Sequence, residues 1–179
     1  YIENSVPTLV FGKKGMNVEL SILAGNTAAT AYSYANEWMA GIPDEALLSS
    51  VNIPATHDTG TAGVVDDLVP SVSITSCQNL YYDEQLNMGA RSFDIRANAT
   101  KDDASAADVK IVHGGELWQC QEKNGSDLTL QSILNTSLGF LEKHKSETVI
   151  LTVKSDAGST IGLEHALAEF IEKNKDKVY

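Results

Sequence analysis

The protein has 179 residues, a length that favours one domain with a hydrophobic core or part of a larger domain. The formal net charge of -11 argues against nucleic-acid binding, because a phosphate backbone requires a basic surface, and against strong electrostatic adsorption to anionic lipid. No apolar run is long enough to span a membrane. The chain begins at Tyr1 rather than at a methionine, so we expect a processed or cut product.

The first 37 residues differ in composition from the rest. They contain a short apolar run at 6–11 and a stretch rich in glycine, asparagine, alanine and threonine at 24–31. We expect residues 1–37 to form a prelude of strands and loops or the tail of a preceding domain. A second region is expected over residues 38–179.

From Trp38 onward the hydrophobic pattern predicts strands that alternate with helices. Such alternation is typical of an α/β fold with a mostly parallel sheet. The predicted strands are 47–53, which Pro54 ends, 90–97, 108–113 and 147–154, and the predicted helices are 77–88, 130–144 and 163–174.

Polar side chains stand where the predicted strands end. His57 follows the first strand, Arg96 ends the second, His113 ends the third and Lys154 ends the fourth. Parallel α/β folds place their chemistry at that edge of the sheet. Two histidines and an arginine can supply a base, an acid and a cation for one phosphodiester. Convergence of four such residues favours a site over ordinary core histidines.

Several short motifs follow one another between about residue 38 and residue 154. They are the segments 38–39, 42–44, 53–61 (Ile-Pro-Ala-Thr-His-Asp-Thr-Gly-Thr), 85–86, 89–96 (Gly-Ala-Arg-Ser-Phe-Asp-Ile-Arg), 112–114, 140–141 and 146–151. This ordered set resembles the catalytic X region of phosphatidylinositol-specific phospholipase C in its bacterial form. Ala55 stands where that family commonly has glycine.

The resemblance implies a distorted, TIM-like (β/α) barrel. A whole barrel takes roughly 250 residues, and only about four strands are visible, so we expect the N-terminal half of one. The family's second half supplies an aspartate that orients the first histidine and groups that hold the inositol ring. We therefore expect the isolated chain to be inactive, and to self-associate through exposed strand edges or to associate with a missing C-terminal half.

The same resemblance implies roles for six residues. His57 would be the general base on the inositol 2-hydroxyl, and His113 the general acid to the leaving diacylglycerol oxygen. Arg96 would bind the phosphate oxygens, with Lys154 adding positive charge. Asp58 would hydrogen-bond to His113, and Asp94 would position Arg96.

The implied substrate is phosphatidylinositol or a glycosylated form, and the products are diacylglycerol and a cyclic inositol phosphate. Peripheral membrane contact and a secreted or cell-surface location are expected with it. No cofactor or metal is expected. The calcium-dependent relatives carry carboxylates where this chain has Arg96 and Lys154, and asparagine where it has Asp58; a cation of the protein replaces the metal cation.

Two rival functions stay open. A glycerophosphodiester phosphodiesterase is also a (β/α) barrel, but its metal is held by a Glu-x-Asp pair at the position where this sequence reads Asp94-Ile95-Arg96. The other rival is a non-catalytic lipid- or glycan-binding module.

Cys77 and Cys120 can form one disulfide or remain two thiols. Both cysteines are expected in loops on one side of a parallel sheet, where such loops can be neighbours, so the disulfide is the prediction to test.

Overall fold

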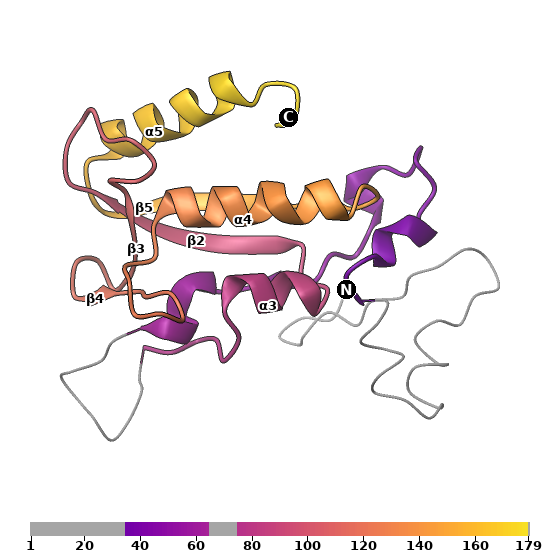
Figure 1. Ribbon diagram of the computed structural model, residues 1–179, viewed down its shortest axis with the longest axis horizontal. Helices are drawn as coiled ribbons and strands as arrows, with labels where there is room; N and C mark the ends of the chain where they lie inside the picture. The colour runs from indigo at the N-terminus through magenta and orange to yellow at the C-terminus, as the bar shows by residue number, and fades with distance from the viewer. Residues whose placement is uncertain (1–34, 65–74, 179) are drawn as a thin grey trace.

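The computed structural model describes residues 35–64 and 75–178, which form one sheet packed against helices (Figure 1). Almost all of the predicted prelude, residues 1–37, therefore lies outside the described residues. None of the described helices has both the length and the apolar character needed to cross a membrane. In chain order the elements are η1 (Trp38–Gly41), η2 (Leu48–Ser50), β1 (Ala55–Thr56), η3 (Thr59–Gly63), α3 (Tyr82–Asn87), β2 (Ser92–Ala99), β3 (Lys110–His113), β4 (Trp118–Gln119), α4 (Leu130–Lys143), β5 (Ile150–Gly158) and α5 (Thr160–Lys173).

Strand β2 is the centre of the sheet. Strand β5 runs parallel to it along its whole length. Because β5 occupies one edge, the opposite edge is shared by β1, parallel to the start of β2, and β3, antiparallel near its end. Strand β4 pairs antiparallel with β3. Parallel pairing was correctly expected for β1 and β5 but wrongly for β3, because the link 100–109 has no crossover helix and an antiparallel return needs none.

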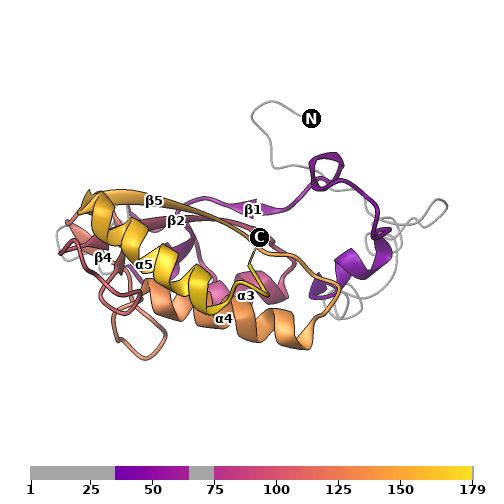
Figure 2. The same ribbon diagram turned by 90° about the horizontal axis from the view of Figure 1, so that it is seen from above.

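The sheet has a helical side and an opposite side. Figure 2 shows α3, α4 and α5 on the same side of β1, β2 and β5. Towards the core, β2 buries Phe93, Ile95 and Ala97, each at most 1% exposed. Side chains alternate along a strand, so Asp94 and Arg96 lie on the face away from these helices.

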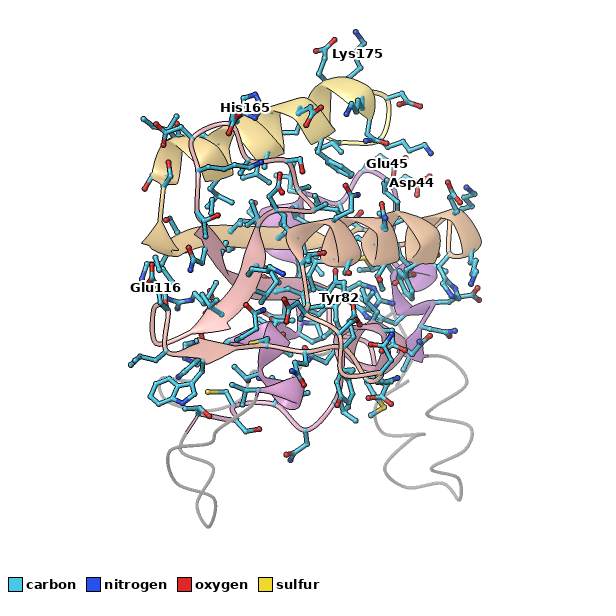
Figure 3. The ribbon with its side chains drawn as sticks, turned by 60° about the vertical axis from the view of Figure 1, so that its left-hand side comes forward. Asp44, Glu45, Tyr82, Glu116, His165 and Lys175 are labelled. Atoms are coloured by element: carbon cyan, nitrogen blue, oxygen red, sulfur yellow. The ribbon has the colours of Figure 1, made fainter. Side chains whose placement is uncertain are left out.

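Tyr82 connects two helices to the central strand. Its ring meets Phe93 edge-on with centroids 4.8 Å apart, and its hydroxyl hydrogen-bonds to Ser137 of α4 at 2.6 Å. Burial raises the pKa of this phenol. In Figure 3 Tyr82 lies inside the molecule, whereas His165 and Lys175 project from the outer segment formed by α5 and the residues after it.

The strand predicted at 47–53 is wrong. A short 3-10 turn forms there instead, in which the backbone N–H and the hydroxyl of Ser50 both donate to the Leu47 carbonyl, at 2.8 and 2.7 Å. Leu47 is 71% exposed, so the apolar run does not enter the core. Pairing with β2 begins only at Ala55, after Pro54, which has no N–H to donate.

The remaining elements were predicted with shifted ends. Helix α4 matches its prediction closely, with Thr129 capping its start. Helix α3 begins at Tyr82 rather than at residue 77. At this start the Glu84 carboxylate accepts from the Tyr81 N–H at 2.8 Å. Helix α5 starts at Thr160 because Ser159 caps it, and β5 runs from Ile150 to Gly158 instead of 147–154.

A buried ion pair joins the starts of β2 and β5. Arg91 and Glu147, both with fully buried side chains, are linked through Arg91 Nε and Nη2 at 2.9 and 2.8 Å. The guanidinium also donates to the carbonyls of Leu86 and Ala90, at 2.6 and 2.7 Å, and lies 4.6 Å from the Phe140 ring centroid. Its charge is thus surrounded by acceptors, although burial lowers its pKa.

The same pair holds the segment that precedes β1. The second oxygen of Glu147 accepts from the Met39 N–H at 3.0 Å, and Arg91 donates to the Ala35 carbonyl at 3.3 Å. Trp38 donates to the Gly89 carbonyl at 2.8 Å beside it. One ion pair therefore fixes three separate stretches of chain.

We predict that Glu147→Gln lowers the free energy of unfolding by about 3–5 kcal/mol, because it leaves the Arg91 charge buried without its counter-ion. Urea unfolding measures the change. Glu142→Gln, which removes an exposed partner of Lys177, is the matched control and should change it little. A loss for Glu147→Gln no larger than that of the control would contradict the structural role of the pair.

Candidate active site

The Asp94 carboxylate is the centre of the site. Its two oxygens accept a bidentate pair of hydrogen bonds from Arg96, Nε to Oδ1 and Nη2 to Oδ2, both at 2.8 Å. Oδ2 also meets His57 Nδ1 at 2.9 Å and accepts from the Asp58 N–H at 3.3 Å. Asp94 and Arg96 share a face of the sheet because they are two residues apart on β2. Partial burial works to raise the pKa of Asp94, but the hydrogen bonds from Arg96 and Asp58 outweigh it and hold that pKa below its ordinary value.

Asp58 turns the chain at the end of β1. Among the described residues it is the one non-glycine with positive φ, at 45°, a left-handed conformation that costs energy and is often retained at functional sites. Its side chain is 7% exposed. Oδ1 lies 3.3 Å from Arg96 Nε, while Oδ2 lies 3.0 Å from His57 Nε2 and 3.1 Å from His113 Nδ1.

The two histidines therefore reach the same carboxylate oxygen from different strands. The ring of His57 is 69% exposed and that of His113 is 22% exposed. The predicted contact between Asp58 and His113 is present as an ion pair, but the buried Nδ1 of His113 has no aligned hydrogen-bond partner among the described residues. After His113 the chain turns at Gly114, φ 61°, where a Cβ would lie 2.6 Å from Trp118.

Lys154 lies at the border of this cluster. It is paired in register with Arg96 across β2 and β5, and its side chain is 60% exposed. Its ammonium lies 3.5 Å from Asp156. Arg96 and Lys154 both stand within their strands rather than at the ends, contrary to prediction, because β2 and β5 continue three and four residues further.

Asp156 is a site residue that the sequence analysis missed. It lies 3.5 Å from Arg96 Nη1 and accepts from the Gly115 N–H at 3.2 Å. It is also the extra residue of a bulge, since Ala97 pairs with Ser155 and the next β2 residue pairs with Ala157. Burial works to raise its pKa, but the Gly115 N–H and the cations Lys154 and Arg96 hold that pKa below its ordinary value.

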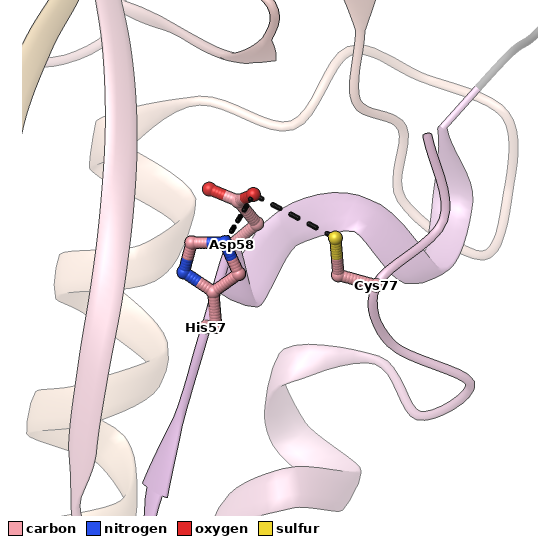
Figure 4. Close-up of side chains that lie close together, drawn as sticks. All are labelled: His57, Asp58 and Cys77. Atoms are coloured by element: carbon pink, nitrogen blue, oxygen red, sulfur yellow. Dashed lines mark hydrogen bonds and ion pairs between the residues drawn. The ribbon is translucent and has the colours of Figure 1, made fainter. Parts of the chain in front are cut away.

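The predicted disulfide is wrong, because Cys77 and Cys120 are free thiols. Cys120 is fully buried in the core. Cys77 is exposed and belongs to a different environment: Thr61 accepts from its N–H at 3.0 Å, and its thiol donates to Asp58 Oδ2 at 3.6 Å (Figure 4). Partial burial and the Asp58 charge raise the pKa of the Cys77 thiol.

The chemistry available on this sheet face is now clear. A guanidinium with a fixed orientation shares the carboxylates of Asp58 and Asp94 with two imidazoles. Arg96 keeps its charge, because the Asp94 hydrogen bonds raise its pKa. A planar cation of this kind suits phosphate oxygens, and histidine suits proton transfer near neutral pH.

Fold and site together define a class: half of a (β/α) barrel with a histidine–arginine site on the sheet face away from the helices. Comparison with known proteins gives the family. A model described as "Phosphatidylinositol-specific phospholipase C, X domain" matches residues 51–174. The chain belongs to this family.

Individual proteins similar to this chain carry names that agree with the family model. The chain is similar to a 1-phosphatidylinositol phosphodiesterase of Listeria monocytogenes, with 30% identity over 145 residues, and to one of Staphylococcus aureus strain Newman, with 31% over 122. These alignments cover 80% and 68% of this chain but 40% and 35% of the relatives. The chain thus spans less than half the length of the curated relatives it matches.

Solved structures confirm the expected barrel fold. The phosphatidylinositol-specific phospholipase C of L. monocytogenes matches with TM-score 0.60 and 28% identity, over 81% of this chain and 47% of that one. A mutant of the S. aureus phosphatidylinositol-specific phospholipase C matches with TM-score 0.63 and 25% identity, over 82% and 45%. The described sheet is therefore part of a TIM-like barrel.

We predict that the denatured, unreduced protein titrates two thiols with a chromogenic thiol reagent, since no disulfide joins Cys77 and Cys120. In the native protein only the exposed Cys77 should react promptly, and Cys77→Ser should remove that fast phase. The absence of any thiol in the denatured sample would contradict the free-thiol structure.

Proposed function

We propose that the protein containing this chain cleaves phosphatidylinositol without a catalytic metal ion, releasing diacylglycerol and a cyclic inositol phosphate. One observation carries the proposal: the Asp94 fork holds Arg96 beside His57, while Asp58 brings His113 to the same place. A base, an acid and a fixed cation are thus presented on one face of the sheet.

His57 is the proposed general base. Asp94 at Nδ1 holds the exposed ring, and Nε2, which lies 3.0 Å from Asp58 Oδ2, is the atom that would receive the proton of the inositol 2-hydroxyl. The hydroxyl oxygen then attacks phosphorus within the same molecule, so little ordering is needed. The family resemblance implied a carboxylate from the other half of the barrel for this orientation; Asp94 supplies one within this chain.

His113 is the proposed general acid. It gives a proton to the diacylglycerol oxygen as the bond between that oxygen and phosphorus breaks. Asp58 is a positioning residue that stabilises the charged ring of His113 and sets its place beside Arg96. Its left-handed backbone is the local strain that this position requires.

Arg96 is the proposed phosphate-binding group. Negative charge on the non-bridging oxygens grows in the transition state, and a pre-oriented cation stabilises that charge most. Lys154 and Arg96 stand on paired positions, so both cations can face one phosphate. A metal-dependent glycerophosphodiester phosphodiesterase is disfavoured, because Arg96 stands where that reaction needs a metal-binding carboxylate.

The proposal also covers the range of substrates, contact with a membrane and the location of the protein. The phosphate and inositol are common to phosphatidylinositol and its glycosylated forms, so either fits the cluster. Peripheral contact with a membrane follows from a lipid substrate, as does a secreted or cell-surface location if the substrate faces outward.

Beyond their pairing with β2, β1 and β5 have no further strand partner within residues 35–64 and 75–178. We infer that a C-terminal half of the barrel or a second copy covers those edges, and that the isolated chain is inactive.

We predict that the complete enzyme cleaves phosphatidylinositol vesicles equally well in excess EDTA, and that Arg96→Asp lowers kcat by about 10²–10³ or more, because the transition-state charge loses its main cation. Release of water-soluble inositol phosphate measures the rate. Lys123→Met, an exposed lysine that pairs with Asp83, is the control and should retain activity. Loss of activity in EDTA with recovery on adding calcium would refute the metal-free mechanism.

We predict that His57→Ala and His113→Ala each lower kcat by about 10²–10⁴ without unfolding the protein, since neither ring is part of the hydrophobic core. The circular dichroism spectrum should stay unchanged. His165→Ala, on the outer helix α5, should keep full activity. If either site variant kept most of its kcat, its role as base or acid would be wrong, and binding of inositol lipid without turnover in the wild type would favour the non-catalytic module.

A further inference from the structure

Three possible metal ligands of different chemical types meet beside the proposed base. His57, Asp58 and Cys77 each offer one atom, and the three atoms lie within 4.8 Å of one another (Figure 4). Two belong to neighbouring residues, which converge because the backbone at Asp58 is left-handed. The third comes from a separate segment that Thr61 holds in place through the Cys77 N–H.

The spacing suits a tetrahedral cation. Zinc bond lengths place adjacent nitrogen and oxygen ligands about 3.4 Å apart, and adjacent oxygen and sulfur ligands about 3.6 Å apart. His57 Nε2 lies 3.0 Å from Asp58 Oδ2, and Cys77 Sγ lies 3.6 Å from the same oxygen. The nitrogen–oxygen separation has to widen by about 0.4 Å to reach that geometry, whereas the oxygen–sulfur separation already matches it.

A second observation concerns the other ring nitrogen. Histidine ligands of zinc usually donate their second N–H to a carboxylate, which fixes the tautomer and orients the ring. Asp94 Oδ2, 2.9 Å from His57 Nδ1, occupies that position. In this tautomer Nε2 and Asp58 Oδ2 are two acceptors facing each other, and a cation bound to both satisfies both.

The surrounding charge also favours a cation. Asp58, Asp94 and Asp156 place three carboxylates against the two cations Arg96 and Lys154. Arg96 approaches Asp58 through Oδ1 and leaves Oδ2 to the two histidines and the Cys77 thiol.

We propose that His57, Asp58 and Cys77 form a binding site for a thiophilic divalent cation such as Zn²⁺. Thiolate, imidazole and carboxylate together select zinc or cobalt, whereas calcium and magnesium prefer oxygen ligands alone. The thiol gives up its proton to solvent as the metal–sulfur bond forms. With three protein ligands, a water or a fourth side chain completes the tetrahedron.

This site would act against the proposed reaction rather than in it. The cation takes Nε2 of His57, the atom proposed to receive the hydroxyl proton, so the loaded protein loses its general base. This consequence rests on the proposed function, whereas the metal site itself does not. Zinc is therefore expected to inhibit, and EDTA to relieve the inhibition, in an enzyme whose catalysis needs no metal.

Cobalt binding to the reduced, metal-free chain tests the site directly. Titration with Co²⁺ should give an absorption band from thiolate-to-cobalt charge transfer at one ion per chain, and Zn²⁺ should displace it. Cys77→Ser should abolish the band, since Cys120 remains but is fully buried. Asp94→Asn, which keeps the shape but weakens the orientation of His57, should raise Kd by about 10–100-fold. His165→Gln is the control histidine and should bind normally.

Each remaining outcome decides the proposal. No charge-transfer band, or a band that survives in Cys77→Ser, would overturn it. In the complete enzyme, inhibition by Zn²⁺ should be weakened roughly tenfold or more in Cys77→Ser, a residue outside the proposed catalytic set. Unchanged inhibition in that variant would also overturn the site. If the protein shows no phospholipase C activity at all, the cobalt titration still tests the metal site, and only the proposed function fails.

Discussion

The register between β2 and β5 is the constraint on which the rest of the structure depends. It begins with the Arg91–Glu147 ion pair, immediately before Ser92 and Ile150 start to pair. Four residues further along, the same register places Arg96 opposite Lys154. A slip of β5 by one residue would turn Lys154 to the helical face while Arg96 stayed on the other face. An ion pair is better suited to prevent this slip than an apolar contact, because its hydrogen bonds are satisfied in one geometry only.

The site applies the same logic at a smaller scale. Asp94 connects the fork of Arg96 with the ring of His57, so the cation and the base cannot move independently. Asp58 then adds His113 through its second oxygen. The charged groups contact one another directly, so two alternate positions of β2 and one strained turn assemble the centre of the cluster. Hydrogen bonds and nearby cations hold the pKa of Asp94 and the pKa of Asp156 below their ordinary values, so these two carboxylates stay ionised near neutral pH.

Sequence alone predicted much of this, and the reasons for the successes and failures are physical. His57, Asp58, Asp94 and Arg96 lie in short motifs where neighbouring residues act together, so local reading finds them. Asp156 was missed because its role comes from a bulge, and a bulge is set by pairing with another strand. The strand expected at 47–53 failed for a related reason: its leucines are apolar, but no partner edge reaches them. Glu147 was read as the first residue of a strand, although a carboxylate there is useful only opposite Arg91. The thiols were misjudged because parallel loops can be neighbours without bringing their cysteines together.

The shared oxygen of Asp58 explains how one arrangement can serve catalysis and also be open to inhibition. This oxygen lies close to two imidazole nitrogens, at 3.0 and 3.1 Å, and carries the negative charge of the carboxylate. In the proposed reaction the transferred proton and the substrate phosphate, which Arg96 would hold, occupy this region in sequence. Between turnovers nothing of the substrate is present, and Cys77 adds a soft donor at the rim. A cation that prefers sulfur and nitrogen can therefore compete where calcium cannot. In the mechanism that we propose, Arg96 and Lys154 supply the positive charge at the phosphate, while the histidines and the thiol offer ligands to a different cation.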